Sequence, residues 1–309
     1  MNKLVIITGP TAVGKSDLSI ELAKRINGEI ISADSIQVYK GLDIGSAKIT
    51  EEEMQGIPHH LIDVLSPKDD FNIYIFKEMA SNAIKEIVKK GKIPIIVGGT
   101  GFYIQSVIYD IDFKEEDNSE IRNELEKVLD EKGSEYLHNM LREIDEESAE
   151  KIHPNNTKRV IRAIEYYKLN DRPISEHNVE EKAKDAVYDA KYFVLTDDRE
   201  KLYKKINERV DKMIDSGLVD EVEGLLSLGL DSSYNSMQGI GYKEVVDYLD
   251  GKTTLEVAKD NIKKNTRHFA KRQLTWFRRE DNVIWVDKSK YDYDNERILS
   301  YMTGIINNG

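Results

Sequence analysis

Eight residues near the start of the chain could bind and activate a phosphorylated substrate. They read GPTAVGKS and match the phosphate-binding pattern G-x-x-x-x-G-K-[ST] between an apolar, strand-like run and a helix-prone stretch. In such a loop, successive backbone N–H groups surround phosphate oxygens, and the N-terminus of the following helix adds a positive field. Lys15 supplies a positive charge, and Ser16 a hydroxyl suited to Mg²⁺. The predicted anion site consists of Gly9, Pro10, Thr11, Ala12, Val13, Gly14, Lys15 and Ser16.

A carboxylate follows the second strand expected in the chain, Glu29–Ala33. Asp34 directly ends this strand and stands 19 residues after Lys15. In a right-handed strand–helix–strand unit, the carboxyl end of the second strand lies beside the loop that follows the first. Asp34 is therefore expected to face the bound phosphates as a general base or a contact to Mg²⁺. Asp also favours turns and helix caps, so a purely structural role stays open.

Other polar positions are candidates for the same site. Thr11 lies inside the loop, where its hydroxyl can donate to the anion or satisfy a neighbouring backbone group. Arg199 and Arg209 flank a helical stretch, and either can reach a phosphate from across the cleft or form a surface ion pair.

The strand expected at Ile93–Val97 ends in Gly98-Gly99-Thr100-Gly101. ATP hydrolases and many kinases place an Asp at such a strand end to help hold Mg²⁺. Glycines instead permit close approach of the backbone to a flat or bulky group. This difference disfavours a small-molecule kinase, which the loop by itself would also fit.

Composition restricts the class of protein. The 309 residues are 39% hydrophobic and 33% charged, as expected for a globular protein with one large domain or a core and a second lobe. No run of 18 apolar residues is present, so no membrane partner is expected. The absence of cysteine excludes disulfides and Cys-based zinc sites, and the six histidines show no ligand spacing. With no visible signal peptide, we expect a cytoplasmic protein.

The net charge of −12 is unevenly distributed. Residues 112–189 carry 22 acidic and 13 basic side chains, whereas residues 259–280 carry 2 acidic and 8 basic ones. The basic segment also contains His268, Phe269, Trp276 and Phe277. Cations on one side of a helix can follow RNA phosphates, and exposed aromatic rings can stack on bases. A solvated face paired with acidic residues is the alternative. The cluster Lys158, Arg159 and Arg162 leaves the same choice between RNA contact and ion pairs.

Alternating strand and helix signals over the first 110 residues predict an α/β fold, a parallel sheet flanked by helices. From about residue 113 to 190 the pattern becomes charged and helical, which predicts an inserted helical domain within a core formed by 1–112 and 191–309. The expected strands are 4–8, 29–33, 93–97, 192–196 and 283–286. The main expected helices are 16–26, 71–90, 119–131, 134–144, 156–169, 253–279 and 295–306.

Together, GPTAVGKS, SADSIQVYKGLDIGSAK, PHHLID, IPIIVGGTGFY, KIHPNN with KRVIRAIE, MQGIGYKE and TRHFAKRQLTWFR resemble the bacterial tRNA dimethylallyltransferase (tRNA isopentenyltransferase) family. The resemblance extends over residues 3–287. It implies a P-loop kinase-like core whose inserted helical domain grips the anticodon stem-loop. It also implies transfer of a dimethylallyl group from dimethylallyl diphosphate to N6 of adenine 37 of tRNA, with Mg²⁺ as cofactor. We expect a monomer.

The resemblance also implies roles for particular residues. The loop residues 11–16 would hold the diphosphate, Asp34 would act as base, and Arg199, aligned across a one-residue gap, would assist the diphosphate. Thr11, Lys15, Asp34 and Arg199 are thus the expected catalytic residues, and Ser16 the metal ligand. The expected tRNA contacts are Asp34, Ser35, Ile36, Gln37, Thr100, Arg122, Asn156, Thr157, Lys158, Arg159, Val160, Ser236, Met237, Gln238, Gly239, Ile240, Gly241, Thr266, Arg267, His268, Phe269, Ala270, Lys271, Arg272 and Gln273.

A non-catalytic RNA-binding module is disfavoured, because it would not need Thr11, Lys15, Ser16 and Asp34 together. A transferase that acts on free adenine nucleotides would need neither the helical insertion nor the basic segment 259–280.

Overall fold

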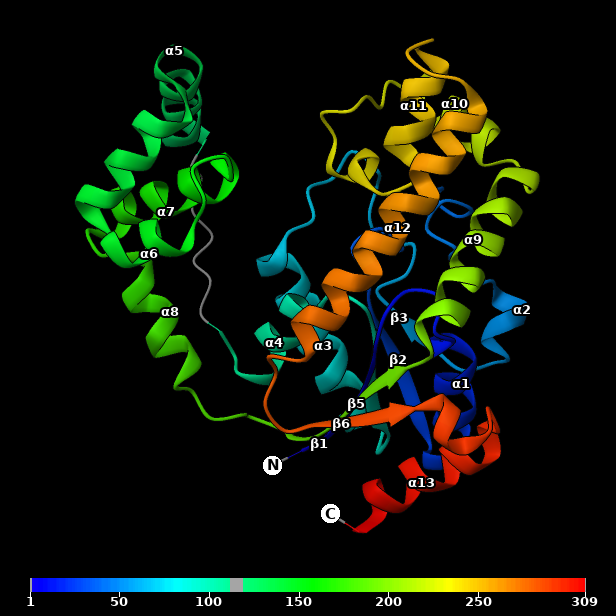
Figure 1. Cartoon of the computed structure of the whole chain (residues 1–309). Helices are drawn as coiled ribbons and strands as arrows, with labels where there is room; N and C mark the ends of the chain where they lie inside the picture. Colours follow the sequence, from blue (N-terminus) through cyan, green and yellow to red (C-terminus); the bar gives the residue numbers. More distant parts are fainter. Residues whose placement is uncertain (1, 112–118, 309) are drawn as a thin grey trace. The chain divides into compact units, whose positions relative to one another are not determined.

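The computed structural model describes residues 2–111 and 119–308, which belong to two compact units (Figure 1). The first unit contains residues 1–110 and 186–309, and the second contains residues 111–185. The boundary on the C-terminal side precedes the expected one at 190/191. The reason is that the returning strand begins at Asp189 and pairs with the first strand from there. Binding of tRNA by the second unit stays a prediction.

The first unit is built on a sheet of six parallel strands, which confirms the expected α/β fold. Their order is β3-β2-β4-β1-β5-β6. Strand β3 was not expected, because its two residues are too few to show a hydrophobic periodicity. The strands are β1 (Lys3–Thr8), β2 (Gly28–Ala33), β3 (His59–His60), β4 (Ile93–Gly98), β5 (Asp189–Thr196) and β6 (Val283–Asp287).

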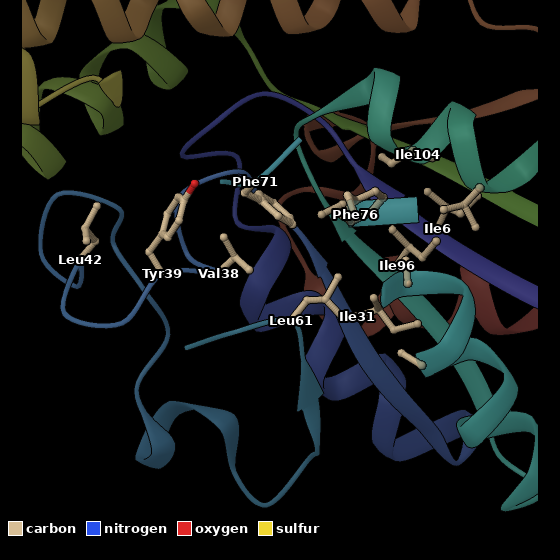
Figure 2. Close-up of a cluster of buried hydrophobic side chains, with 14 of the residues drawn as sticks. Ile6, Ile31, Val38, Tyr39, Leu42, Leu61, Phe71, Phe76, Ile96 and Ile104 are labelled. Carbon is tan, nitrogen blue, oxygen red and sulfur yellow. The ribbon is translucent and has the colours of Figure 1, made fainter. Parts of the chain in front are cut away.

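Side chains of the central strands alternate between the two faces of this sheet, because successive residues of a strand point to opposite sides. Leu4 and Ile6 of β1 belong to one buried cluster, whereas Val5 and Ile7 belong to another. Figure 2 shows the first cluster, where Ile6, Ile31 and Ile96 of three adjacent strands meet aromatic and aliphatic side chains from the following helices and loops. Both faces are therefore covered, as all-parallel sheets require.

Helices of the first unit supply these covers (Figure 1). Residues of α3, α4, α10 and α11 pack in the first cluster, and residues of α1 and α13 in the second. Helices α9 and α12 contribute to both. The helices are α1 (Lys15–Ile26), α2 (Glu51–Met54), α3 (Ile73–Lys89), α4 (Gly101–Ile108), α9 (Arg199–Asp215), α10 (Leu218–Ser227), α11 (Tyr242–Leu249), α12 (Leu255–Phe277) and α13 (Asn295–Asn308), with short 3₁₀ helices η1 (Asn235–Gln238) and η2 (Lys288–Tyr291).

The second unit is helical in its described part, as expected from its charged, strand-poor sequence. It contains α5 (Ser119–Ile144), α6 (Glu146–Lys151), α7 (Thr157–Asn170) and α8 (Ile174–Lys182), around a small core that includes Leu125, Leu141 and Ile164. The two helices expected over 119–131 and 134–144 form one interrupted helix. Gly133 breaks it with φ of 80°, a conformation that glycine adopts without strain.

None of the helices within residues 2–111 and 119–308 combines the length and apolarity needed to cross a membrane.

Candidate functional site

The loop between β1 and α1 holds the phosphate-binding residues in a preformed shape. Gly9 adopts φ of 141°, and a Cβ there would lie 2.4 Å from the Leu195 carbonyl oxygen of the adjacent strand. Gly14 adopts φ of 89° at the start of α1. The Lys15 ammonium donates to the carbonyl oxygens of Gly9 at 3.1 Å and Pro10 at 2.9 Å. Lys15 therefore links the end of the loop to its start by hydrogen bonds, and its positive charge lies at the predicted anion site.

A cleft of about 600 Å³ lies at this edge of the sheet. The register explains why, since Thr8, Ala33 and Gly98 end neighbouring strands and bring their following loops together. The residues lining the cleft come from the loop and the start of α1, from β2 and β3 and the segments that follow them, from the end of β4 and the glycine after it, and from α9 and α12. They are Thr11, Ala12, Gly14, Lys15, Ser16, Asp17, Ser19, Ile30, Ser32, Asp34, Gln37, Ala47, Ile49, Glu53, His59, Ile62, Val97, Gly98, Gly99, Lys205, Glu208, Arg209, Lys212, Phe269 and Gln273.

Asp34 stabilises a turn and also lines the cleft. Its Oδ1 accepts hydrogen bonds from the backbone N–H groups of Ile36 at 2.9 Å and Gln37 at 3.2 Å, so it stabilises the turn after β2. Its Oδ2 accepts no hydrogen bond from any described residue. The side chain also lines the cleft. One carboxylate oxygen thus fixes the geometry, and the other is available to a ligand.

The charges around the loop favour an anion. Burial and the nearby Arg209 guanidinium together lower the pKa of Lys15 to about 8, and Asp34 opposes this shift. Burial also lowers the pKa of Arg209, again against the effect of Asp34. Two desolvated cations thus face one carboxylate, and an anion bound between them would relieve their repulsion.

Arg199 does not line the cleft. It begins α9, and its guanidinium lies over the Tyr203 ring, 5.2 Å from the centroid. Arg209 lies ten residues later on the same helix and does line the cleft. Arg209 is therefore the arginine of α9 that lines the cleft, and a contact of Arg199 with the diphosphate stays a prediction.

The glycines after β4 allow close approach by the protein itself. A Cβ at Gly99 would lie 2.0 Å from Gln273 Nε2, and one at Gly101 would lie 2.2 Å from the Trp276 indole. Gln273 accepts from the Thr11 N–H at 2.9 Å and donates to the Gly99 carbonyl oxygen at 3.1 Å. The flat group that the glycines admit is thus Trp276 of α12. Thr100 directly precedes α4, beside this contact.

Several residues that were expected to contact tRNA have side chains that pack inside the protein. Ile36 lies beside Gly239, where an added Cβ would be 3.3 Å away. Ser236 and Met237 are fully buried, and Ser236 Oγ donates to the Pro67 carbonyl oxygen at 2.7 Å. Val160 and Ala270 are buried as well. The side chains of these buried residues are therefore not available to RNA, and they support neighbours that are.

Helix α12 presents only part of its basic sequence to solvent. Arg267 donates to Asn207 of α9 at 2.6 Å, and Lys259 and Lys263 both pair with Asp211 of the same helix. The exposed cationic side chains of the helix include Lys264, His268, Lys271 and Arg272, of which His268 carries charge only when protonated. Phe269 lies between the two groups and lines the cleft. Helix α12 thus has one face whose basic side chains are paired with α9 and another face whose basic side chains are exposed.

In the second unit, an ion pair is formed by Arg122, which lies outside the basic cluster Lys158, Arg159 and Arg162. Arg122 donates to Glu165 at 2.8 Å, and the Glu165 side chain is 3% exposed. Lys158 and Arg159 are exposed near the start of α7. The three residues of the cluster form no salt bridge with a described residue, and their contact with RNA stays a prediction.

Two further residues of the first unit take part in the site or its support, although the sequence interpretation gave them no role. Glu221 of α10 accepts hydrogen bonds from the backbone N–H groups of Asp43, Ile44 and Gly45, which fixes the loop that carries the cleft residue Ala47. His59 lines the cleft, and burial lowers its pKa. An isolated Glu in a helix has no pattern to mark it, whereas PHHLID offered a motif.

The donor atoms beside the loop fit Mg²⁺. Ser16 is exposed at the cleft, and Asp34 has a carboxylate oxygen without a partner among the described residues. Mg²⁺ prefers oxygen ligands, keeps several waters and takes its remaining ligands from substrate phosphates. No cluster of three or more His, Asp or Glu in residues 2–111 and 119–308 forms a separate metal site.

The chain is similar to known proteins over nearly all of its length. The IPP transferase family matches residues 37–280. The tRNA dimethylallyltransferase of Lachnoclostridium phytofermentans is 56% identical over 307 residues, which cover 99% of this chain and 98% of that protein. The tRNA dimethylallyltransferase of Acetivibrio thermocellus is 52% identical over 300 residues, covering 97% and 96%.

Solved structures extend this similarity to the fold. A tRNA isopentenylpyrophosphate transferase from Staphylococcus epidermidis is 45% identical, with a TM-score of 0.74 over 100% of this chain and 99% of that one. A eukaryotic dimethylallyltransferase acting on tRNA is 31% identical, with a TM-score of 0.83 over 100% of this chain and 80% of that one.

Proposed function

Because the chain belongs to the IPP transferase family, we propose that it is a tRNA dimethylallyltransferase. It transfers a dimethylallyl group from dimethylallyl diphosphate to N6 of adenine 37, next to the anticodon of tRNA, and releases diphosphate. The observation that carries this proposal is the shared cleft, where the phosphate-binding loop and the free oxygen of Asp34 meet. We also propose that the enzyme acts as a cytoplasmic monomer.

The diphosphate of the donor binds at the loop. As the allylic C1–O bond breaks, negative charge grows on the departing diphosphate and cation character on C1. Lys15, Arg209 and the loop N–H groups lie where this negative charge increases, so they stabilise the transition state more than the ground state. Each charge-assisted hydrogen bond contributes about 1.5–3 kcal/mol, so a few of them supply a large part of the barrier reduction.

Asp34 serves as the general base. The exocyclic amine of adenine is a weak nucleophile, and it loses a proton as its nitrogen bonds to C1. The free Oδ2 of Asp34 accepts this proton, while Oδ1 keeps the carboxylate in place through Ile36 and Gln37. Such a base contributes about 10²–10⁴-fold to the rate.

Apolar residues enclose the reacting carbon. Ile30, Ile49, Ile62 and Val97 line the cleft and suit a branched five-carbon group. They also exclude water, which would otherwise compete with adenine for the allylic cation. The adenine must leave the stack of the anticodon loop, at a cost of a few kcal/mol. Phe269 offers a ring at the cleft on which the extruded base can stack.

The exposed cations of α12 and of α7 bind the RNA backbone. Lys264, Lys271 and Arg272 lie on the same helix as Phe269, so phosphate contacts and base binding share one rigid element. Lys158 and Arg159 supply further cations from the helical insertion. Contacts of this kind offset the cost of extruding the base.

Mg²⁺ is the proposed cofactor. Ser16 and Asp34 would hold it, and when bound it neutralises charge on the diphosphate. Asp34 would then act both as the general base and as a ligand of Mg²⁺. The rate of an Asp34→Asn variant with and without excess Mg²⁺ separates these two roles.

The decisive experiment incubates the protein with dimethylallyl diphosphate, Mg²⁺ and unmodified tRNA, followed by mass analysis of the nucleosides. We expect an adenosine heavier by one dimethylallyl group at position 37. Unmodified adenosine in the presence of intact, folded protein would refute the proposal. A parallel reaction with γ-labelled ATP and nucleosides tests the kinase alternative, for which β4 lacks the usual terminal Asp.

A further inference from the structure

Lys288 contacts the phosphate-binding loop from outside the cleft. It begins η2, the short 3₁₀ helix after β6, and its ammonium donates to the Val13 carbonyl oxygen at 3.3 Å. A Cβ added at Gly14 would lie 3.2 Å from the same ammonium nitrogen. Lys288 does not line the cleft, whereas Gly14 does. Lys288 therefore contacts the Val13–Gly14 peptide without being part of the cleft lining.

This placement fixes the direction of one backbone donor. The C=O and N–H of a trans peptide point in opposite directions, and the described residues contain no cis peptide. With the Val13 oxygen held by Lys288, the Gly14 N–H points away from the lysine. That N–H donates to no acceptor among the described residues.

The peptide would otherwise turn easily. Gly14 has φ of 89°, and glycine populates positive and negative φ about equally, so the residue itself does not fix the peptide plane. The neighbouring Thr11 N–H is already used by Gln273. An anion must therefore bind the remaining N–H groups of the loop. Contacts from outside the loop must orient these groups.

We propose that Lys288 is a positioning residue that holds the Val13–Gly14 peptide with its N–H directed at the bound diphosphate. The inference rests on the proposed function, in that the anion is the diphosphate of the donor or of the product. The charge on Lys288 polarises the peptide as well as orienting it, which strengthens the N–H as a donor.

The surroundings of Lys288 support this role over a simple ion pair. Its ammonium makes no salt bridge with a described carboxylate, and the bond to Val13 is its one side-chain hydrogen bond to the described residues. The nearby Asp197 is fully buried and pairs with Lys205 at 2.7 Å instead. Burial lowers the pKa of Lys288, and Lys205 adds to this effect, whereas Asp197 and Asp17 oppose it.

The test measures binding of inorganic pyrophosphate by calorimetry to the full chain and to three variants. Lys288→Met removes the donor, Lys288→Arg keeps a cation that can reach the carbonyl, and Lys290→Met removes an exposed lysine of the same turn. We expect the Kd for pyrophosphate to rise about tenfold in Lys288→Met and less than about threefold in the other two. The KM for dimethylallyl diphosphate should rise in parallel, with little change in kcat or in the KM for tRNA.

Each remaining outcome has a defined meaning. Wild-type affinity for pyrophosphate in Lys288→Met would overturn the inference. So would an equal loss of tRNA and pyrophosphate affinity with a lowered melting temperature, because that pattern indicates general structural damage. If Lys288→Met selectively loses pyrophosphate affinity while the wild-type protein modifies no tRNA, the proposed function fails and the inference stands.

Discussion

The Gln273 side chain accepts a hydrogen bond from the Thr11 backbone N–H at 2.9 Å and so joins α12 to the phosphate-binding loop. Its amide nitrogen donates to the Gly99 carbonyl oxygen at 3.1 Å, which adds the loop after β4. The side chain is 5% exposed, so these bonds form in a largely dry environment. One residue of the proposed RNA-binding helix thereby ties together two loops of the proposed donor site.

Gln273→Glu should destabilise the protein by about 1–3 kcal/mol. The carboxylate still accepts from Thr11, but it cannot donate to Gly99 and places a charge beside that carbonyl oxygen. Urea unfolding monitored by tryptophan fluorescence gives the difference in free energy. Arg272→Gln, on the exposed neighbour, serves as the control and should unfold like the wild-type protein. Equal stability of the two variants would show that the bridge contributes nothing.

Asp34→Asn should lower kcat by about 10²–10⁴-fold without unfolding the site. Asparagine retains an oxygen that can accept from Ile36 and Gln37, so the turn after β2 is preserved while the base is lost. The measurement is single-turnover transfer at saturating tRNA and donor, with and without excess Mg²⁺. A rate restored by Mg²⁺ would assign Asp34 to the metal. Near-normal turnover would exclude the base role.

The position of Asp34 shows how much of this site the sequence could predict. Parallel strands end at the same edge of a sheet, so chain order placed Asp34 and the loop at one edge, but it did not show that β4 lies between β1 and β2. The glycines after β4 were recognised as sites of close approach, but their partner was not. The contact with Trp276 depends on how α12 crosses the sheet, and no local pattern specifies that crossing.

Which of the two arginines of α9 faces the cleft could not be predicted from the sequence. Arg199 and Arg209 differ by ten residues on a helix, which places them on different parts of its surface, and the residues alone do not say which one faces the cleft. Glu221 was missed because three of its four hydrogen bonds come from backbone N–H groups, which leave no trace in side-chain identity, and the fourth comes from the Tyr242 hydroxyl, 21 residues away. Long-range packing decided each of these positions.

Arg209→Ala should lower kcat by about 10²–10³-fold, because it removes a desolvated cation from the departing diphosphate. Arg199→Ala serves as the matched variant on the same helix. Its guanidinium lies over Tyr203, so its loss should change kcat less than about threefold. Steady-state kinetics with both substrates varied provide the comparison. A larger fall in kcat for Arg199→Ala than for Arg209→Ala would assign the catalytic role to Arg199.

Donor binding should weaken above about pH 8. The pKa of Lys15 in the free protein is about 8, below its ordinary value of 10.5, and only the protonated amine attracts diphosphate. The ratio kcat/KM for dimethylallyl diphosphate should therefore fall as pH rises through this value. A bound anion raises the pKa of Lys15, so kcat at saturation should stay level to higher pH. Lys15→Arg should lack this alkaline limb, since arginine remains charged; an unchanged limb in that variant would assign the titration to another group.

Acid should destabilise the protein through Glu29. Burial of this side chain raises its pKa, but hydrogen bonds from His60, Lys92 and Lys90 outweigh burial and lower the pKa to about 2. A carboxylate with a pKa below its unfolded value of 4.5 stabilises the fold fully above pH 4.5, and the contribution is lost as pH falls towards 2.

Glu29→Gln should accordingly cost about 3 kcal/mol at pH 7, because it leaves the cations around a buried position without their counter-charge. The variant and the wild-type protein should converge in stability as pH is lowered from 4.5. Urea denaturation at a series of pH values measures both effects, with the exposed Glu86→Gln on α3 as the control. A difference between Glu29→Gln and wild type that stays constant down to pH 2 would mean that Glu29 acts through packing and not through its charge.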